Sequence, residues 1–148
     1  MNDEEIAASL GVTGLVLNDK AMGPKEKHAF LGAEIAKKIL TSKQISLELS
    51  DNEINAISLA ILYHDKPEEV AGANYPMPIE TQLLVDLDHI WSFTYLNFWQ
   101  DTLRKGVAPH DYWENLDYDL DACFVTKIGK EKARELLAQR KTEIDHSD

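Results

Sequence analysis

The chain has 148 residues, 44% of them hydrophobic, which is enough for one domain with its own core. Its formal net charge of -11 opposes polyanions, so bulk nucleic acid and membranes are disfavoured as partners. The single cysteine, Cys123, excludes an intrachain disulfide and a cysteine-based zinc site. Because the first residues are acidic and no apolar run reaches the roughly 18–20 residues of a membrane span, we expect a cytoplasmic location. We also expect one domain over residues 1–148, with a polar tail from about residue 143.

The first half of the chain predicts helices. A short helix is expected over residues 3–10, closed by Gly11, whereas the state of residues 12–17 is left open. Pro24 suits the first turn of a helix whose apolar residues recur at helical spacing until Thr41. Ser50 and Glu53 match a capping box, in which each side chain satisfies a free backbone N–H of the other residue.

The second half is also predicted to be helical. Residues 66–78, which include three prolines and a glycine, are expected to form a loop. A long helix is predicted from about Glu80 to Leu103, stopping at Gly106. One short helix is expected over residues 109–120 and an amphipathic one over residues 129–144. These patterns predict an all-α helical bundle.

Ligand-type side chains lie on the faces that should be buried. His28 is two turns before Ile35, so its ring is expected to enter the interior, and His64 ends an apolar face of its helix. Asp88 interrupts the apolar stripe of the long helix, and Asp86 could reach the same centre from the side. Since burying unpaired imidazoles and carboxylates is costly, a divalent metal is an attractive partner for them.

Simpler explanations exist for each of these residues. A histidine that ends a helix face often bonds a backbone carbonyl or acts as a cation at the helix C-terminus. An aspartate in an apolar stripe often lies at a turn that water reaches. The coincidence of such residues on three helices is what favours a shared metal site.

The residues that carry these features resemble the HD superfamily of metal-dependent phosphohydrolases. The similar segments are residues 27–40, the run from Ile57 to the pair His64-Asp65, and residues 84–90. The family signature is a His, then a His-Asp doublet, then a distant Asp, all from a helical bundle that binds one or two divalent metals. The resemblance implies an HD-like fold over roughly residues 15–93.

In the direct register of this pattern, one metal site is complete. Its ligands are His28, His64, Asp65 and Asp88. The family usually places more than one helix between the doublet and the last aspartate, whereas only a short segment separates them here.

A shifted register gives a different assignment. His28 then resembles a later histidine of the family, and Asp86 and Asp88 resemble its Asp-x-Asp segment. The doublet would fall at Asn18-Asp19, where the histidine is replaced. This register, which fits slightly better, implies a shortened or degenerate member.

The resemblance implies hydrolysis of a phosphomonoester, phosphodiester or nucleotide. A metal (Mn, Fe, Zn, Co, Ni or Mg) would activate water and hold a phosphoryl oxygen. Asp65 or Asp86 would be the catalytic base. Lysines would contact the remaining phosphate charge, the candidates being Lys20, Lys25 and Lys27. The lysines are also explained as solvated helix-end residues.

The alternative function is a catalytically degenerate HD-like module for ligand sensing or protein interaction. A homodimer is compatible with both functions.

Other candidate sites have less support. Cys123 lacks a local pattern for a nucleophilic pair and is better explained as a small buried hydrophobe. His110-Asp111 follows Pro109 and is predicted to be a helix N-terminus. The aromatic residues between 91 and 113 are expected to be core, a pocket wall or an interface.

Overall fold

The computed structural model describes residues 3–9, 11, 22–42 and 48–146, and within these ranges the protein is all-α, as predicted. Residues 12–17, Asn18-Asp19 and Lys20 lie outside the described part of the chain. Among the described helices none is both long and apolar enough to cross a membrane. The elements are α1 (Asp3–Ser9), α2 (Pro24–Leu40), α3 (Asp51–Tyr63), α4 (Pro67–Ala71), α5 (Ile79–Ile90), the 3-10 turn η1 (Trp91–Phe93), α6 (Tyr95–Lys105), α7 (Pro109–Cys123) and α8 (Lys127–Asp145).

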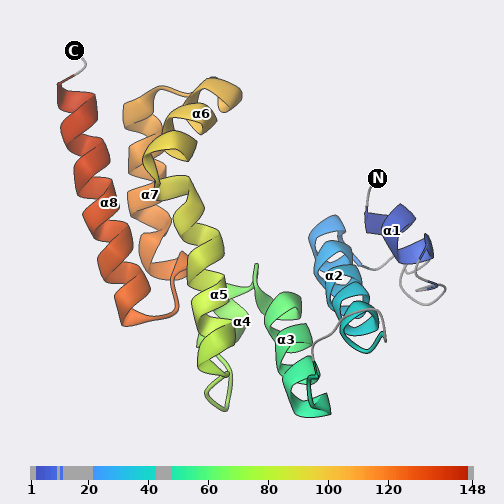
Figure 1. Cartoon of the computed structure of the whole chain (residues 1–148). Coiled ribbons are helices and arrows are strands. Elements are labelled where there is room, and N and C mark those ends of the chain that lie inside the picture. Colours follow the sequence, from blue (N-terminus) through green and yellow to red (C-terminus); the bar gives the residue numbers. More distant parts are fainter. Residues whose placement is uncertain (1–2, 10, 12–21, 43–47, 147–148) are drawn as a thin grey trace.

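The helices are packed in a row. In Figure 1, α1 and α2 lie at one side, α3 packs between α2 and α5, and α6, α7 and α8 lie on the far side of α5. The N- and C-terminal ends of the chain are at opposite ends of this row. The α3–α5 contact therefore joins an N-terminal pair of helices, α2 and α3, to a C-terminal group, α5 to α8.

The predicted helix boundaries are confirmed where a local capping signal exists. Ser50 N–H donates to Glu53 Oε2 at 2.8 Å, which is half of the capping box at the start of α3. Pro24 is the first residue of α2. Gly106 ends α6 with φ +66°, a left-handed conformation that costs glycine little.

The loop predicted over residues 66–78 is partly wrong, because α4 occupies its first part. Pro67 is the first residue of α4, where its missing N–H is harmless, and Pro67 and Val70 are buried. The expected C-terminal tail from about residue 143 is also shortened, because α8 continues to Asp145.

The single long helix expected between Glu80 and Leu103 is broken at η1. Thr94 is extended, with φ -70° and ψ 153°, and its hydroxyl donates to the Trp91 carbonyl at 2.8 Å. The Asn97 side chain donates to the same hydroxyl oxygen at 2.8 Å. Thr94 is the N-cap residue of α6, a position that threonine favours, so α6 starts anew after it.

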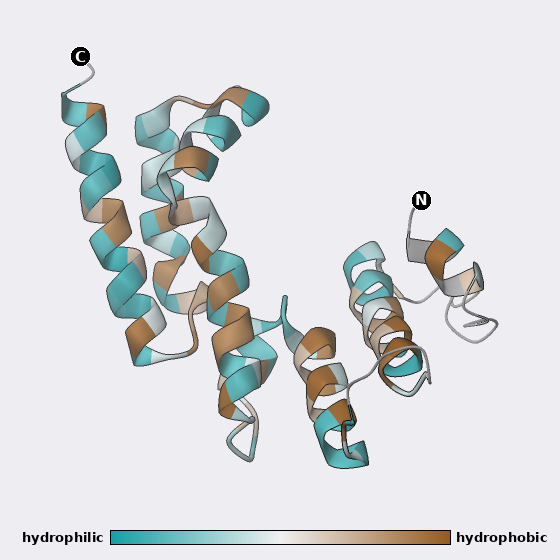
Figure 2. Cartoon of the chain, in the orientation of Figure 1, coloured by the Kyte–Doolittle hydropathy of each residue, from teal (hydrophilic) through white to brown (hydrophobic). Residues whose placement is uncertain are grey.

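The main core lies in the C-terminal group of helices. One cluster is centred on Phe93 and Phe124, whose rings meet edge to face at 5.2 Å, and a second on Phe98 and Tyr112. Figure 2 shows hydrophobic residues recurring along α5, α7 and α8 on this side and along α2 and α3 on the other. The prediction of which face of α5 is buried is wrong, because the buried residues of α5 are Thr81, Val85 and Asp86.

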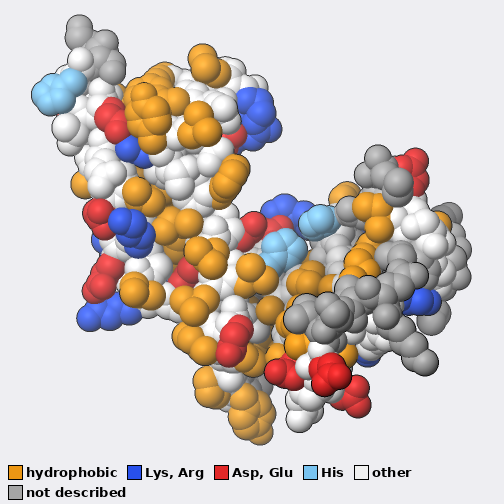
Figure 3. Space-filling model, viewed as in Figure 1, with side chains coloured by type: hydrophobic (Ala, Val, Ile, Leu, Met, Phe, Trp, Pro, Cys, Tyr) orange, Lys and Arg blue, Asp and Glu red, His pale blue; other side chains and the backbone are white. Residues whose placement is uncertain are grey.

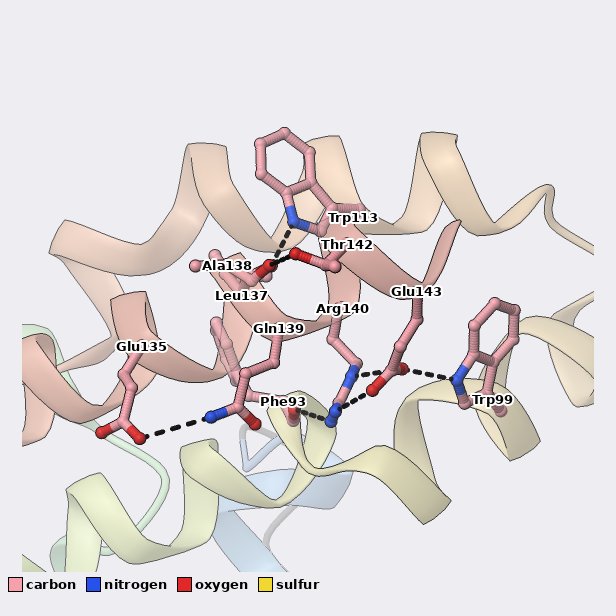
Figure 4. A network of polar contacts seen from close by, with 10 residues as sticks. All are labelled: Phe93, Trp99, Trp113, Glu135, Leu137, Ala138, Gln139, Arg140, Thr142 and Glu143. Carbon is pink, nitrogen blue, oxygen red and sulfur yellow. Dashed lines mark hydrogen bonds and ion pairs between the residues drawn. The ribbon is translucent and has the colours of Figure 1, made fainter. Parts of the chain in front are cut away.

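An ion pair between the buried Arg140 and the half-buried Glu143 fixes α8 against η1 and α6 (Figure 4). Arg140 is 3% exposed and donates to the Glu143 carboxylate at 2.6 and 2.9 Å and to the Phe93 carbonyl at 3.2 Å. Glu143 also accepts a bond from Trp99 Nε1 at 3.0 Å. The buried guanidinium is thus both neutralised and hydrogen-bonded, as burial of a charge requires.

Candidate functional site

Charged and imidazole side chains from four helices gather where the N-terminal pair meets the C-terminal group. Because α2 and α3 are consecutive and packed together, the first turns of α2 lie beside the end of α3. Figure 3 shows histidine side chains next to basic and acidic ones at this junction. We call these residues the junction cluster: Lys25 and His28 of α2, His64 and Asp65 after α3, Glu68 of α4, Asp88 of α5, and Cys123 at the end of α7.

The two predicted histidine ligands are in contact. The rings of His28 and His64 meet edge to face, with centroids 5.8 Å apart, although the two residues are 36 positions apart in the chain. This pairing is the closest agreement between the structure and the direct register. His28 is nevertheless exposed, so the expectation that its ring enters the interior is wrong.

The second histidine is held in one tautomer. His64 Nδ1 lies 2.6 Å from the Ile61 carbonyl oxygen, which can only accept, so Nδ1 carries the proton. In the neutral imidazole this leaves the Nε2 lone pair for a ligand. A backbone bond of this type orients many metal-binding histidines.

The predicted carboxylate Asp65 is paired with a predicted phosphate-binding lysine. Lys25 Nζ lies 2.9 Å from Asp65 Oδ2, and the lysine side chain is 84% exposed. The hydrogen bond and charge of Asp65 raise the pKa of Lys25, and the charges of Asp88 and Glu68 raise it further. Asp88 and Glu68 therefore act on the same cation, although Asp88 itself is exposed.

Glu68 is a cluster member that the sequence reasoning missed, whereas Cys123 was considered there only as a nucleophile. Burial is the main cause that raises the pKa of the Cys123 thiol, followed by the negative charges of Asp119, Asp65 and Glu68. Glu68 was hidden in a segment predicted to be a loop. The proline that begins α4 was the signal that could have placed it on a helix.

The cluster has metal-ligand chemistry, but its ligand atoms are not drawn together to a metal's coordination distance. Among the described residues, the group of three or more His, Cys, Asp or Glu whose ligand atoms all lie within 4.8 Å of one another is His110, Asp111 and Glu114. His28, His64, Asp65 and Asp88 do not form such a group. A shared ion would require Asp65 to leave Lys25 and the side chains to converge.

Asp86 does not reach this cluster. Its carboxylate is buried and accepts bonds from Val125 N–H at 2.7 Å and Thr126 N–H at 3.1 Å, as well as from the Thr126 hydroxyl. These contacts tie α5 to the start of α8. The prediction of Asp86 as a catalytic base is therefore corrected, since its oxygens are occupied by the fold.

The remaining predicted residues divide by position. Lys27 is half-buried on α2. His110 and Asp111 lie in the first turn of α7, as predicted, and His110 Nδ1 is 3.5 Å from Glu114 Oε1. All three residues of that group are exposed, and the helix dipole explains Asp111 in the first turn of α7.

No family model, no curated protein and no solved structure matches the chain.

Proposed function

We propose that the protein is a divalent-metal-dependent phosphohydrolase of the HD type, acting on a phosphomonoester, a phosphodiester or a nucleotide at the junction cluster. The observation that carries the proposal is the contact between the His28 and His64 rings, with His64 Nδ1 bonded to the Ile61 carbonyl. Two imidazoles from different helices, one of them oriented for binding through Nε2, are a donor pair that suits Mn, Fe, Zn, Co or Ni.

The donor set fits a metal in its chemistry. His28 and His64 would supply nitrogen ligands, and Asp65 and Asp88 would supply carboxylate oxygens. When bound, the ion would supply a water of pKa near ~7 and neutralise phosphoryl charge. In the structure Asp65 is held by Lys25, so this ion pair has to open before the carboxylate can act as a ligand.

The chain's own residues would bind the substrate and move the proton. Lys25 is exposed, cationic and at the first turn of α2, so its ammonium group would pair with phosphate oxygens once it leaves Asp65. Asp65, when not a ligand, would accept the proton of the attacking water. Asp86 has no part in this scheme, because its bonds to α8 occupy it.

Metal analysis of the purified protein tests the proposal. After incubation with Mn²⁺ and removal of the free ion, about one ion per chain is expected for the wild type, and much less for His64→Ala. His110→Ala is the matched control, because it removes the imidazole of the exposed group on α7. If His110→Ala loses the ion while His64→Ala keeps it, the junction cluster is not the metal site.

Turnover is tested separately with a chromogenic phosphodiester and Mn²⁺. The wild type is expected to hydrolyse it, and both His64→Ala and Asp65→Asn are expected to lose most of the activity. Folding of each variant is checked by far-UV circular dichroism. A folded wild type that binds Mn²⁺ but hydrolyses no phosphoester contradicts the enzymatic proposal.

A metal-free HD-like binding module is the second candidate. It is favoured by the Lys25–Asp65 pair at 2.9 Å, which satisfies the carboxylate without any ion, and by the separation of the cluster's ligand atoms. A metal-free protein whose cluster variants retain normal stability supports this second candidate.

A further inference from the structure

A row of hydrophobic side chains runs along the outer face of α5 and into η1. Ile79, Leu83, Leu87 and Trp91 follow one another at four-residue intervals, so they lie on one side of the helix. Their exposed fractions are 54%, 39%, 64% and 63%. Figure 3 shows hydrophobic side chains gathered along this part of the molecule. We call these four residues the α5 ridge.

The ridge borders an apolar groove between α3 and α5. The groove has a volume of about 500 Å³. Its walls include Ala56, Ile57 and Ile61 from α3 and Leu83, Leu84 and Leu87 from α5. Glu53 and Glu80 are the acidic residues that line it. A raised apolar row and an apolar groove therefore lie side by side on one face.

The exposed area matches what an interface between two chains requires. The ridge and Ile57 together expose on the order of 500 Å² of apolar residue surface. Interfaces between identical chains are about 65% apolar and bury about 800 Å² on each standard-size partner, so this face supplies the expected apolar share.

We propose that a second copy of this chain covers the α5 ridge and the adjacent groove, and that the protein is a homodimer with two-fold symmetry. In such an interface the same patch is used by both chains, so the ridge of each copy enters the groove of the other. A ridge and a groove on one face satisfy this requirement together. The proposal is independent of the proposed catalytic function.

Light scattering coupled to gel filtration tests the association. The wild type is expected at twice the chain mass of 16.7 kDa, and the double variant Leu87→Glu/Trp91→Glu at the single mass. Leu103→Glu is the matched control: Leu103 is 83% exposed on α6, away from the ridge, and its variant should remain dimeric. A monomeric wild type, or a dimeric ridge variant, overturns the proposal.

A second measurement decides the case in which the double variant does not fold. A nitroxide label is placed on Leu87→Cys, and separately on Leu103→Cys, in a Cys123→Ser background. The distance between labels on two copies is expected to be shorter at position 87 than at position 103. An absent inter-chain signal, or the reverse order of distances, overturns the proposal. A monomer that carries a copurified apolar molecule in the groove does the same and identifies a different occupant.

Discussion

Asp86 and Gly129 touch so closely that no larger residue fits at position 129. A Cβ built on Gly129 would lie 2.2 Å from Asp86 Oδ2 and 2.5 Å from its Cγ. Asp86 lies on α5 and Gly129 in the first turn of α8, so the missing side chain lets the buried carboxylate reach the α8 N-terminus. The α5–α8 connection depends on this pair.

Gly129→Ala is expected to lower the free energy of unfolding by about 1–3 kcal/mol, because the new methyl group must displace Asp86 from its backbone bonds. Urea denaturation measures the change. Gly32→Ala on α2 is the control, since its Cβ would meet only Ile61 Cγ2 at 3.2 Å and a helix-interior alanine offsets that contact. Equal effects of the two substitutions would contradict the close packing described.

The Arg140–Glu143 pair makes a second prediction about stability. Glu143→Ala removes the carboxylate that bonds both Arg140 and Trp99, and leaves a guanidinium that is 3% exposed without its counter-charge. A loss of about 2–4 kcal/mol in the free energy of unfolding is expected. Glu135→Ala, on the same helix with exposed partners, should change it by less than about 1 kcal/mol.

The double variant Arg140→Met/Glu143→Leu separates charge from packing. Replacing both partners by apolar residues removes the uncompensated charge, so its loss should be smaller than that of Glu143→Ala alone. A double variant less stable than the single variant would show that the shape of the ion pair matters more than its charge.

The predictability of the fold follows from how local each signal is. Ser50 and Glu53 act within one turn, and Gly106 acts alone, so the sequence pattern places both boundaries correctly. The break at Thr94 is harder to predict, because threonine also occurs inside helices, as Thr102 does in α6. The apolar periodicity over residues 84–98 continues across Thr94, so the spacing alone predicts one unbroken helix.

The candidate site divides in the same way. His28 and His64 meet because α2 and α3 are neighbours in sequence, and such helices commonly pack together. The contacts of Asp86 join residues 39 and 40 positions apart, and no spacing within α5 encodes them. Periodicity also predicted that the apolar stripe with Leu87 and Trp91 is buried, whereas both residues are exposed. Periodicity identifies an apolar face but does not tell whether the same chain covers it.

The Cys123 thiol gives a prediction with a pH dependence. Burial and nearby carboxylates raise its pKa, so at pH 8 it should react with iodoacetamide more slowly in the folded protein than in urea, and the rate should rise as pH increases. A raised folded-state pKa stabilises the protein below the unfolded-state pKa, near ~8.5, and this contribution is lost as pH rises through the folded-state value. Cys123→Ser should lack the thiol's part of that alkaline loss. Equal alkylation rates in folded and unfolded protein would contradict the assignment.

Lys25→Met distinguishes the two roles proposed for the Lys25–Asp65 pair. If Lys25 holds a carboxylate that a metal needs, its removal frees Asp65, and Mn²⁺ should bind up to about fivefold more tightly, which corresponds to the ~0.2–1 kcal/mol of an exposed ion pair. If Lys25 also meets substrate phosphate, the same variant should raise the KM for the phosphoester. Calorimetric titration with Mn²⁺ and steady-state kinetics measure the two effects separately.

Lys66→Met is the control, because it removes a neighbouring lysine whose ion-pair partner, Glu69, lies outside the cluster. Weaker Mn²⁺ binding by Lys25→Met would contradict this expectation. It would mean that the Lys25–Asp65 pair supports the metal site, and Asp65 would no longer be a ligand in the proposed scheme.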